Sequence, residues 1–183
     1  MLRLASLTIL VLAFLWHPAA AADSPAPAPS PIFCPAKQVF ADCTRAPCTL
    51  TTNGEASCKC RIRDEASVSL GDCTPAKGKT LQSRYYPLRA YQICSNTANW
   101  ANCLGSPCTK NADGTASCAC TTVSSSQFII GLPTDQCSTA RCDDGKIYSS
   151  AMSDAAEGMT ADLEHLPPPG FPGFNPPKIC PAP

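Results

Sequence analysis

The chain has 183 residues, including 14 cysteines and 19 prolines, and its 14 basic side chains balance its 14 acidic ones. A formal net charge of zero excludes bulk binding to nucleic acid, which needs surplus cations to displace counterions from phosphates. The same balance excludes an acidic chelating protein, and the cysteine content approaches that of disulfide scaffolds.

The first 22 residues have the three-part pattern of a cleaved secretory signal. Arg3 gives a basic start, residues 4–16 are uncharged and mainly apolar, and alanines occupy positions 19–22. The apolar run is shorter than the roughly 20 residues that a membrane-spanning helix needs, so an uncleaved anchor is the weaker alternative. We therefore expect a secreted or periplasmic protein with no membrane span after signal cleavage.

Residues 23–33 alternate proline with alanine and serine, which favours an extended polyproline II spacer. We interpret this segment as a Pro/Ala-rich linker. Because exported proteins meet an oxidising compartment, the cysteines that follow are expected to form disulfides, and their even number allows complete pairing.

The cysteines form a repeat with a period of 60 residues, and only the last loop of the second copy is longer. The first copy, module 1 at 34–73, contains Cys34, Cys43, Cys48, Cys58, Cys60 and Cys73. The second copy, module 2 at 94–137, contains Cys94, Cys103, Cys108, Cys118, Cys120 and Cys137. Several other residues also recur, so the two modules are interpreted as a duplication.

Each module carries a hairpin signal ahead of its Cys-x-Cys pair, Asn53-Gly54 in the first and Asp113-Gly114 in the second. These dipeptides tolerate positive φ at both central positions of a tight turn. Because residues two apart in a strand face the same side, Cys58 and Cys60 should bond separate partners. The predicted fold is a small disulfide-rich, mainly β protein with two tandem β-hairpin modules.

Modules of this size rarely gain enough stability from a hydrophobic core alone. Disulfides, at roughly 2–4 kcal/mol each, can supply the remainder. Phe40 and Trp100 occupy the same position in the two copies and are expected to fill each small core. A paired aromatic binding surface is the alternative.

The order Cys-x8-Cys-x4-Cys-x9-Cys-x-Cys-x12-Cys, with its glycine turn, resembles the EGF-like pattern. That resemblance implies pairing of the first cysteine with the third, the second with the fourth and the fifth with the sixth. It would join Cys34 with Cys48, Cys43 with Cys58, Cys60 with Cys73, Cys94 with Cys108, Cys103 with Cys118, and Cys120 with Cys137. Spacing by itself leaves the pairing open.

A second resemblance is carried by Phe40-Ala41-Asp42-Cys43 and Trp100-Ala101-Asn102-Cys103. These segments are similar to repeats of uncharacterised secreted cysteine-rich bacterial proteins. The resemblance implies export and duplication, and it brings no established activity.

Residues 74–93 form a basic and aromatic linker between the modules. It contains no acid, and its cations and tyrosines are Lys77, Lys79, Arg84, Tyr85, Tyr86, Arg89 and Tyr91. One interpretation is a stripe that binds an anionic polymer. The other is a solvated connector whose tyrosines pack on the neighbouring modules.

The C-terminal segment, 138–183, has a different pattern. Apolar residues from Met152 to Leu166 follow helical spacing, which predicts one short helix before the prolines at 167–169 and a proline-rich tail. With six cysteines assigned to each module, Cys142 and Cys180 remain and are expected to pair.

No catalytic constellation is found in the sequence. His165 is the only histidine after the signal, and no phosphate loop or His-Glu-x-x-His motif is present. We therefore expect no catalytic residue, no cofactor and no metal site. Cys-x-Cys remains open as a thiolate metal ligand.

The sequence thus predicts a non-enzymatic binding or structural protein whose partner is an unknown protein or glycan outside the cytoplasm. The loops of unequal length, Arg61–Asp72 and Thr121–Gln136, are the expected contact regions. The alternatives are a protease inhibitor and a thiolate metal-binding protein.

Overall fold

A computed structural model describes residues 31–70, 72–75, 77–86, 88–95, 98–139, 142, 145–150, 165 and 177–181. The chain is mainly β, as predicted. The predicted signal, the tail at 167–176 and, apart from His165, the predicted helix lie outside the described residues. The described part contains no helix that could span a membrane.

The elements of the described residues are β1 (Pro31–Asp42), β2 (Pro47–Leu50), β3 (Glu55–Leu70), β4 (Thr80–Arg84), β5 (Ala90–Cys94), β6 (Ala98–Asn102), β7 (Pro107–Lys110), β8 (Thr115–Ser125), β9 (Phe128–Leu132), a 3-10 turn η1 (Cys137–Thr139), β10 (Ile147–Ser150) and β11 (Lys178–Ile179).

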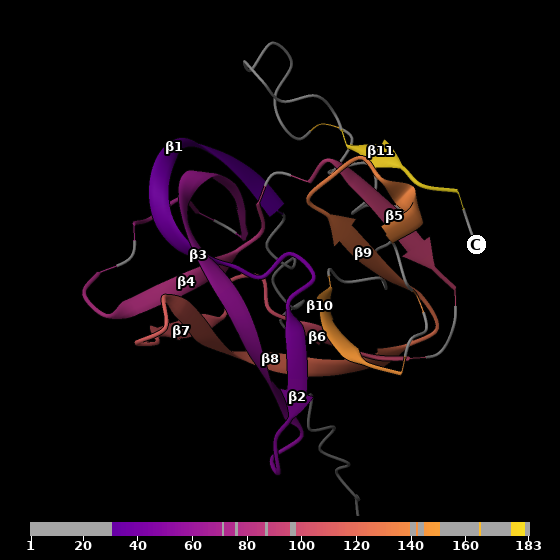
Figure 1. The fold of residues 1–183 in the computed structure, drawn as a ribbon, viewed down its shortest axis with the longest axis horizontal. Coiled ribbons are helices and arrows are strands. Elements are labelled where there is room, and N and C mark those ends of the chain that lie inside the picture. The colour runs from indigo at the N-terminus through magenta and orange to yellow at the C-terminus, as the bar shows by residue number, and fades with distance from the viewer. Residues whose placement is uncertain are drawn as a thin grey trace, which may run out of the picture.

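Eight of these strands close into a barrel, in the order β1-β3-β2-β10-β6-β8-β7-β4, and β3 also pairs with β8. A smaller sheet, β11-β5-β9, lies beside the barrel at the right of Figure 1. The barrel leaves few open strand edges, which is how small β proteins avoid edge-to-edge association.

The two sequence repeats are related by an approximate two-fold axis between β3 and β8. These strands are antiparallel, and Cys58 lies opposite Cys118, its own equivalent in the second repeat. The pairs on either side, Ser57 with Ala119 and Lys59 with Ser117, exchange with each other under the same relation. The duplication in the sequence is therefore a symmetry of the sheet.

The repeats exchange strands across this axis. β4 pairs in parallel with β1 of its own repeat and antiparallel with β7 of the second repeat. β10 runs parallel to β6 and pairs with β2 of the first. Ser83 in β4 and Ser149 in β10 are equivalent: their hydroxyls donate to the carbonyls of Cys103 and Cys43, each in the opposite repeat.

This architecture differs from the expected tandem arrangement. Two separate hairpin modules are not confirmed, because every barrel strand of one repeat belongs to the same closed sheet as the other. The predicted linker at 74–93 contains β4 and β5, and the predicted spacer at 23–33 ends inside β1. Sequence patterns of cysteine spacing carry no information on these long-range pairings.

The hairpins themselves, β2 with β3 and β7 with β8, lie where the glycine turns predict them. Their turns differ in type from the expectation, since only the glycines have positive φ, 76° at Gly54 and 79° at Gly114. The N–H of Thr51 donates to the carbonyl of Glu55 at 2.8 Å, so three residues form the loop. A left-handed glycine closing a three-residue loop is a common hairpin geometry.

All fourteen cysteines are in disulfides, but the EGF-like pairing is wrong. The bonds are Cys34–Cys73, Cys43–Cys60, Cys48–Cys58, Cys94–Cys142, Cys103–Cys120, Cys108–Cys118 and Cys137–Cys180. The expected Cys142–Cys180 bond is therefore also wrong, and the outermost bond differs between the repeats.

Strand register explains the corrected pairing. Cys48 lies directly opposite Cys58 in the β2–β3 ladder. Asp42 lies opposite Arg61, which brings the next residue, Cys43, beside Cys60. Antiparallel register nests one bond inside the other, whereas the EGF-like order would interleave them. Cys58 and Cys60 do bond separate partners, as predicted.

Candidate functional site

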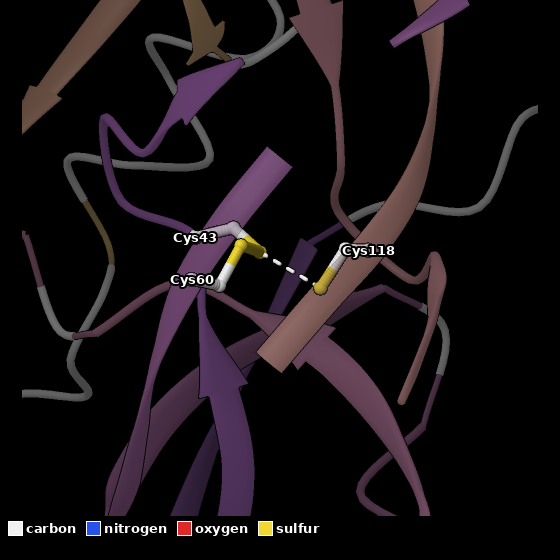
Figure 2. A group of neighbouring side chains, drawn as sticks. All are labelled: Cys43, Cys60 and Cys118. Carbon is white, nitrogen blue, oxygen red and sulfur yellow. Dashed lines mark hydrogen bonds between the residues drawn. A yellow bond between two sulfur atoms is a disulfide. The ribbon is translucent and has the colours of Figure 1, made fainter. Parts of the chain in front are cut away.

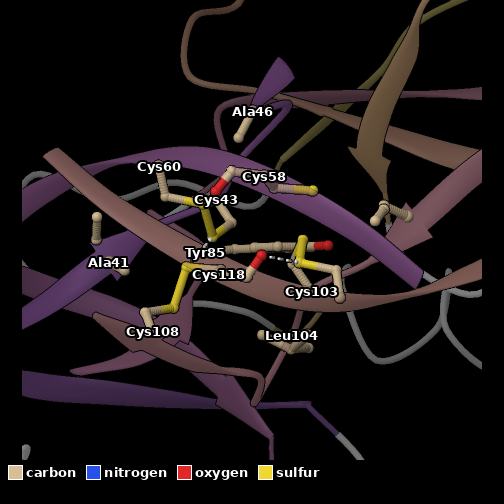
Figure 3. Close-up of a cluster of buried hydrophobic side chains, with 14 of the residues drawn as sticks. Ala41, Cys43, Ala46, Cys58, Cys60, Tyr85, Cys103, Leu104, Cys108 and Cys118 are labelled. Atoms are coloured by element: carbon tan, nitrogen blue, oxygen red, sulfur yellow. Dashed lines mark hydrogen bonds between the residues drawn. A yellow bond between two sulfur atoms is a disulfide. The ribbon is translucent and has the colours of Figure 1, made fainter. Parts of the chain in front are cut away.

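The barrel interior contains a cluster of disulfides. Four disulfides, two from each repeat, pack with small alanines and the buried ring of Tyr85. Figure 3 shows Tyr85 among the core cysteines. The Tyr85 hydroxyl donates to the carbonyl of Ser150, and burial raises the pKa of this phenol. Since every sulfur is bonded to another, the core offers no thiolates in this state.

Phe40 and Trp100 are both buried, as predicted for core residues. Trp100 stacks on Phe128 in a second cluster, between the barrel and the small sheet, with ring centroids 6.4 Å apart. The alternative of an exposed aromatic binding surface is therefore wrong.

The basic and aromatic stripe at 74–93 does not form one surface. Arg84, Tyr85 and Tyr91 are buried, whereas Lys77 and Lys79 are exposed. The Arg84 guanidinium donates to Gln38, Ser67 and the carbonyl of Thr74, and burial lowers its pKa. Its role here is to bind the loop after β3 to the barrel.

A different cluster of cations lines a pocket of about 330 Å³ beside β3. Its charged walls come from the end of β1, the turn at 43–47 and alternate residues of β3, and its remaining walls come from the segment 132–136. The charged lining residues are Asp42, Arg45, Lys59, Arg61 and Arg63. Four cations thus surround one carboxylate; we call this the repeat-1 pocket.

Arg63 is the anchored cation of the repeat-1 pocket. Its Nε lies 2.6 Å from the Asp42 carboxylate, and its guanidinium carbon lies 4.6 Å above the centre of the Tyr86 ring. Although burial opposes it, the hydrogen bond and charge of Asp42 raise the pKa of Arg63. Asp42 also accepts the N–H of Thr44 at 3.0 Å, so the carboxylate fixes both the cation and the turn.

Lys59 and Arg61 are exposed along the same face of β3. Lys59 pairs with Asp113 at 2.8 Å, and the hydrogen bonds from Lys59 and Thr115 lower the pKa of that carboxyl. Among the described residues, the Arg61 guanidinium has no ion-pair partner. Arg61 is therefore the cation of the pocket most available to a ligand.

Arg45 lines the pocket, and its backbone has a left-handed conformation that L-residues rarely adopt. Its φ of 51° is the only positive value among the described non-glycine residues. Its guanidinium carbon lies 5.0 Å from the centre of the Tyr148 ring of β10. The left-handed conformation costs roughly 1–2 kcal/mol for a residue with a Cβ.

The second repeat provides an internal comparison for every charged position in the pocket. The equivalents of Asp42, Arg45, Lys59, Arg61 and Arg63 are Asn102, Gly105, Ala119, Thr121 and Val123. All five are uncharged, and Gly105 has a φ of 82°, matching Arg45. The repeat-2 half of the barrel therefore forms without charges at the equivalent positions.

A second pocket, of about 430 Å³, lies against the equivalent turn of repeat 2. It contains Gly105 where the first contains Arg45, and its only charged lining residues are Asp72 and Lys77. Its other walls come from the loop after β3 and from β4 rather than from β8, and it lacks the cluster of cations.

Sequence reasoning did not single out the repeat-1 pocket. Two of its cations, Arg61 and Arg63, lie in the expected contact loop Arg61–Asp72, but residues 61–70 of that loop are strand in the structure. The signal was nevertheless in the sequence, because the 60-residue alignment pairs each of these charges with an uncharged residue.

No protein-family model, curated protein sequence or solved structure matches the chain significantly.

Proposed function

We propose that the protein is an exported, non-enzymatic binding protein that holds an acidic glycan in the repeat-1 pocket. The observation that carries this proposal is the comparison between repeats. Four cations gather at positions that the sister repeat fills with uncharged residues, in a chain whose net charge is zero. Charges that the scaffold does not need are best explained by a ligand.

Arg45 strengthens the argument at a single position. Glycine satisfies the same turn in repeat 2 without backbone strain. An arginine at this position costs conformational stability but adds a planar cation to the lining of the pocket. Arginine forks match carboxylate and sulfate groups with two parallel hydrogen bonds.

The remaining lining favours a sugar as the carrier of the negative charge. Thr44, Thr134 and Gln136 supply hydroxyl and amide groups, and Pro47 and Pro133 supply apolar faces. Sugar rings need this mixture, since their hydroxyls seek polar partners while their C–H faces pack on apolar ones. The pocket volume suits one or two sugar residues rather than a folded domain.

The barrel supports binding by holding the pocket in one conformation. The turn that carries Arg45 lies between Cys43 and Cys48, both bonded to β3. The N–H of Ala46 in that turn also donates to the Ser149 hydroxyl at 2.7 Å. A rigid site loses little entropy when it binds a ligand.

The test is calorimetric titration with a sulfated oligosaccharide, an oligouronate and a polyglutamate peptide. The pocket variant carries the sister residues, D42N, R45G, K59A, R61T and R63V, and should remain folded. A matched control, K37T with K77A and K79A, removes three exposed lysines that do not line the pocket.

We expect the glycans to bind the wild type and the control alike. Binding to the pocket variant should be at least about tenfold weaker, as expected when charged hydrogen bonds are lost. Absence of glycan binding by the wild type, equal loss in the control, or preference for polyglutamate would each overturn the proposal.

A further inference from the structure

The core disulfides form two close groups of sulfur atoms that share one symmetric contact: Cys43 with Cys118 in the first corresponds to Cys103 with Cys58 in the second. In one, the Sγ atoms of Cys43, Cys60 and Cys118 all lie within 4.8 Å of one another. In the other, those of Cys48, Cys58 and Cys103 do the same. Each group therefore brings a bond of one repeat against a bond of the other.

Figure 2 shows this contact for the first group: the Cys43–Cys60 bond faces Cys118, with 3.5 Å between the Sγ atoms of Cys43 and Cys118. Both sulfurs are oxidised, so this is a packing contact between two disulfides. Thiol–disulfide exchange requires a thiolate beside a disulfide sulfur. The core places potential partners from different bonds next to each other before any bond opens.

The two groups differ in access from solvent. Cys48 is half-buried, whereas its equivalent Cys108 and the other six half-cystines of the core are buried. Exchange rates depend on access as well as on thiolate character. A small thiol can therefore reach the core at one sulfur, in the bond Cys48–Cys58.

The geometry points to Cys48 as a modification site for a low-molecular-weight thiol. Its bonded partner, Cys58, is then released and exchanges with a disulfide of the second repeat. The thiolate attacks Cys48 Sγ, the Cys48–Cys58 bond breaks, and Cys58 leaves as a thiolate. Cys58 then attacks Cys103 Sγ, the Cys103–Cys120 bond breaks, and Cys120 leaves and takes up the proton from the original thiol.

The products balance without any other oxidant or reductant. Two disulfides break and two form, a mixed disulfide at Cys48 and a bond from Cys58 to Cys103, and Cys120 becomes a thiol. The new bond joins the two repeats covalently. In the starting protein none of the four core disulfides does so, because two close within repeat 1 and two within repeat 2. Attack thus changes which strands are cross-linked in the core.

The test uses the full oxidised chain under native conditions with excess glutathione. Samples are quenched with N-ethylmaleimide at intervals and mapped by peptide mass spectrometry. We expect glutathione on Cys48, a cross-linked peptide containing Cys58 and Cys103, and maleimide on Cys120. Labelling of Cys108 should be at least about tenfold lower because it is buried.

The other half-buried cysteines serve as internal references. Cys73, Cys137 and Cys142 belong to none of the close sulfur groups among the described residues, so their bonds should open without re-pairing. The variant C103A/C120A removes the acceptor and should leave Cys58 open to maleimide.

Two results in the wild type would overturn the inference, whether or not that variant folds. One is maleimide on Cys58 with Cys103–Cys120 intact, which means simple opening. The other is no reaction in the core until circular dichroism shows unfolding.

Discussion

Comparison with the equivalent residue Gly105 indicates how much Arg45 contributes to the free energy of unfolding. Replacing it by glycine relieves a left-handed backbone, worth roughly 1–2 kcal/mol. The same change removes the cation–π contact with Tyr148, about 0.5–1 kcal/mol, and adds unfolded-state entropy, about 0.4–1 kcal/mol. We therefore expect R45G to unfold in urea within about 1 kcal/mol of the wild type.

The same variant should bind the glycan probes more weakly by severalfold, because one charged fork is lost. A loss of stability well above 2 kcal/mol with unchanged binding would instead assign Arg45 to the scaffold. The reverse replacement, G105R, is a control: it should destabilise the protein, since no ring equivalent to Tyr148 is placed at that turn, where Gln82 takes the corresponding position in β4.

Asp42 and Arg63 form the pair whose separation should be costly. Asp42 is buried, so R63V leaves its carboxylate without its cation and should lower the unfolding free energy by about 1–3 kcal/mol. Adding D42N recreates the sister pair Asn102 and Val123, and an asparagine can still accept the N–H of Thr44. The double variant should therefore recover most of the loss.

A double-mutant cycle by urea unfolding measures this coupling. Additive losses in the two single variants would show that the ion pair contributes nothing beyond its members.

Predictions for single residues were confirmed where the size and polarity of the side chain alone determine whether it is buried. Phe40 and Trp100 are buried because burial of a large aromatic side chain removes a large apolar area from water. Arg84 was misplaced on a surface stripe because spacing does not reveal a partner such as the Thr74 carbonyl, which allows an arginine to be buried.

At the scale of elements, the ion pair of Lys59 and Asp113 ties β3 of repeat 1 to the hairpin tip of repeat 2. The lowered pKa of Asp113 arises first from Lys59 and then from the hydroxyl and N–H of Thr115. A carboxyl with a lowered folded pKa stabilises the protein above its ordinary pKa and loses that effect as pH falls through the lowered value. Both side chains are exposed, so this effect on stability is small.

K59A should therefore raise the pKa of Asp113 toward its ordinary value without reaching it, because Thr115 still donates two hydrogen bonds. Carboxyl NMR titration of the wild type and the variant gives the shift directly. High salt should move the wild-type value in the same direction. An unchanged pKa in K59A would show that the turn alone holds it low.

The hairpins were the predictable elements, and the exchanged strands were not. Gly54 and Gly114 mark local turns that depend on a few neighbouring residues. The strands β4 and β10 lie outside the cysteine frame, and each has one partner strand in its own repeat and one in the other. Ser83 and Ser149 are equivalent only because of these pairings, so no local pattern could identify them.

At the scale of the whole molecule, covalent and hydrogen-bonded connectivity follow different divisions of the chain. The four core disulfides close within the repeats, whereas β3–β8, β4–β7 and β10–β2 connect them. The disulfides fix the local shape of each hairpin pair. The closed barrel, and with it the repeat-1 pocket, requires both repeats.

A fragment of residues 23–93 tests this division. It retains the cysteines of Cys34–Cys73, Cys43–Cys60 and Cys48–Cys58, so it can form its own bonds. It lacks β8, β7 and β10, the partners of β3, β4 and β2, which leaves strand edges and the apolar core open to water. We therefore expect no folded monomer: the fragment should be disordered by NMR or should dimerise with itself across the two-fold axis.

Sedimentation equilibrium distinguishes a disordered monomer from a dimer of the fragment. Addition of the oxidised second half, residues 94–183, should restore a one-to-one folded complex. A compact monomeric fragment with dispersed amide signals would contradict the exchanged-strand barrel and would restore two independent modules.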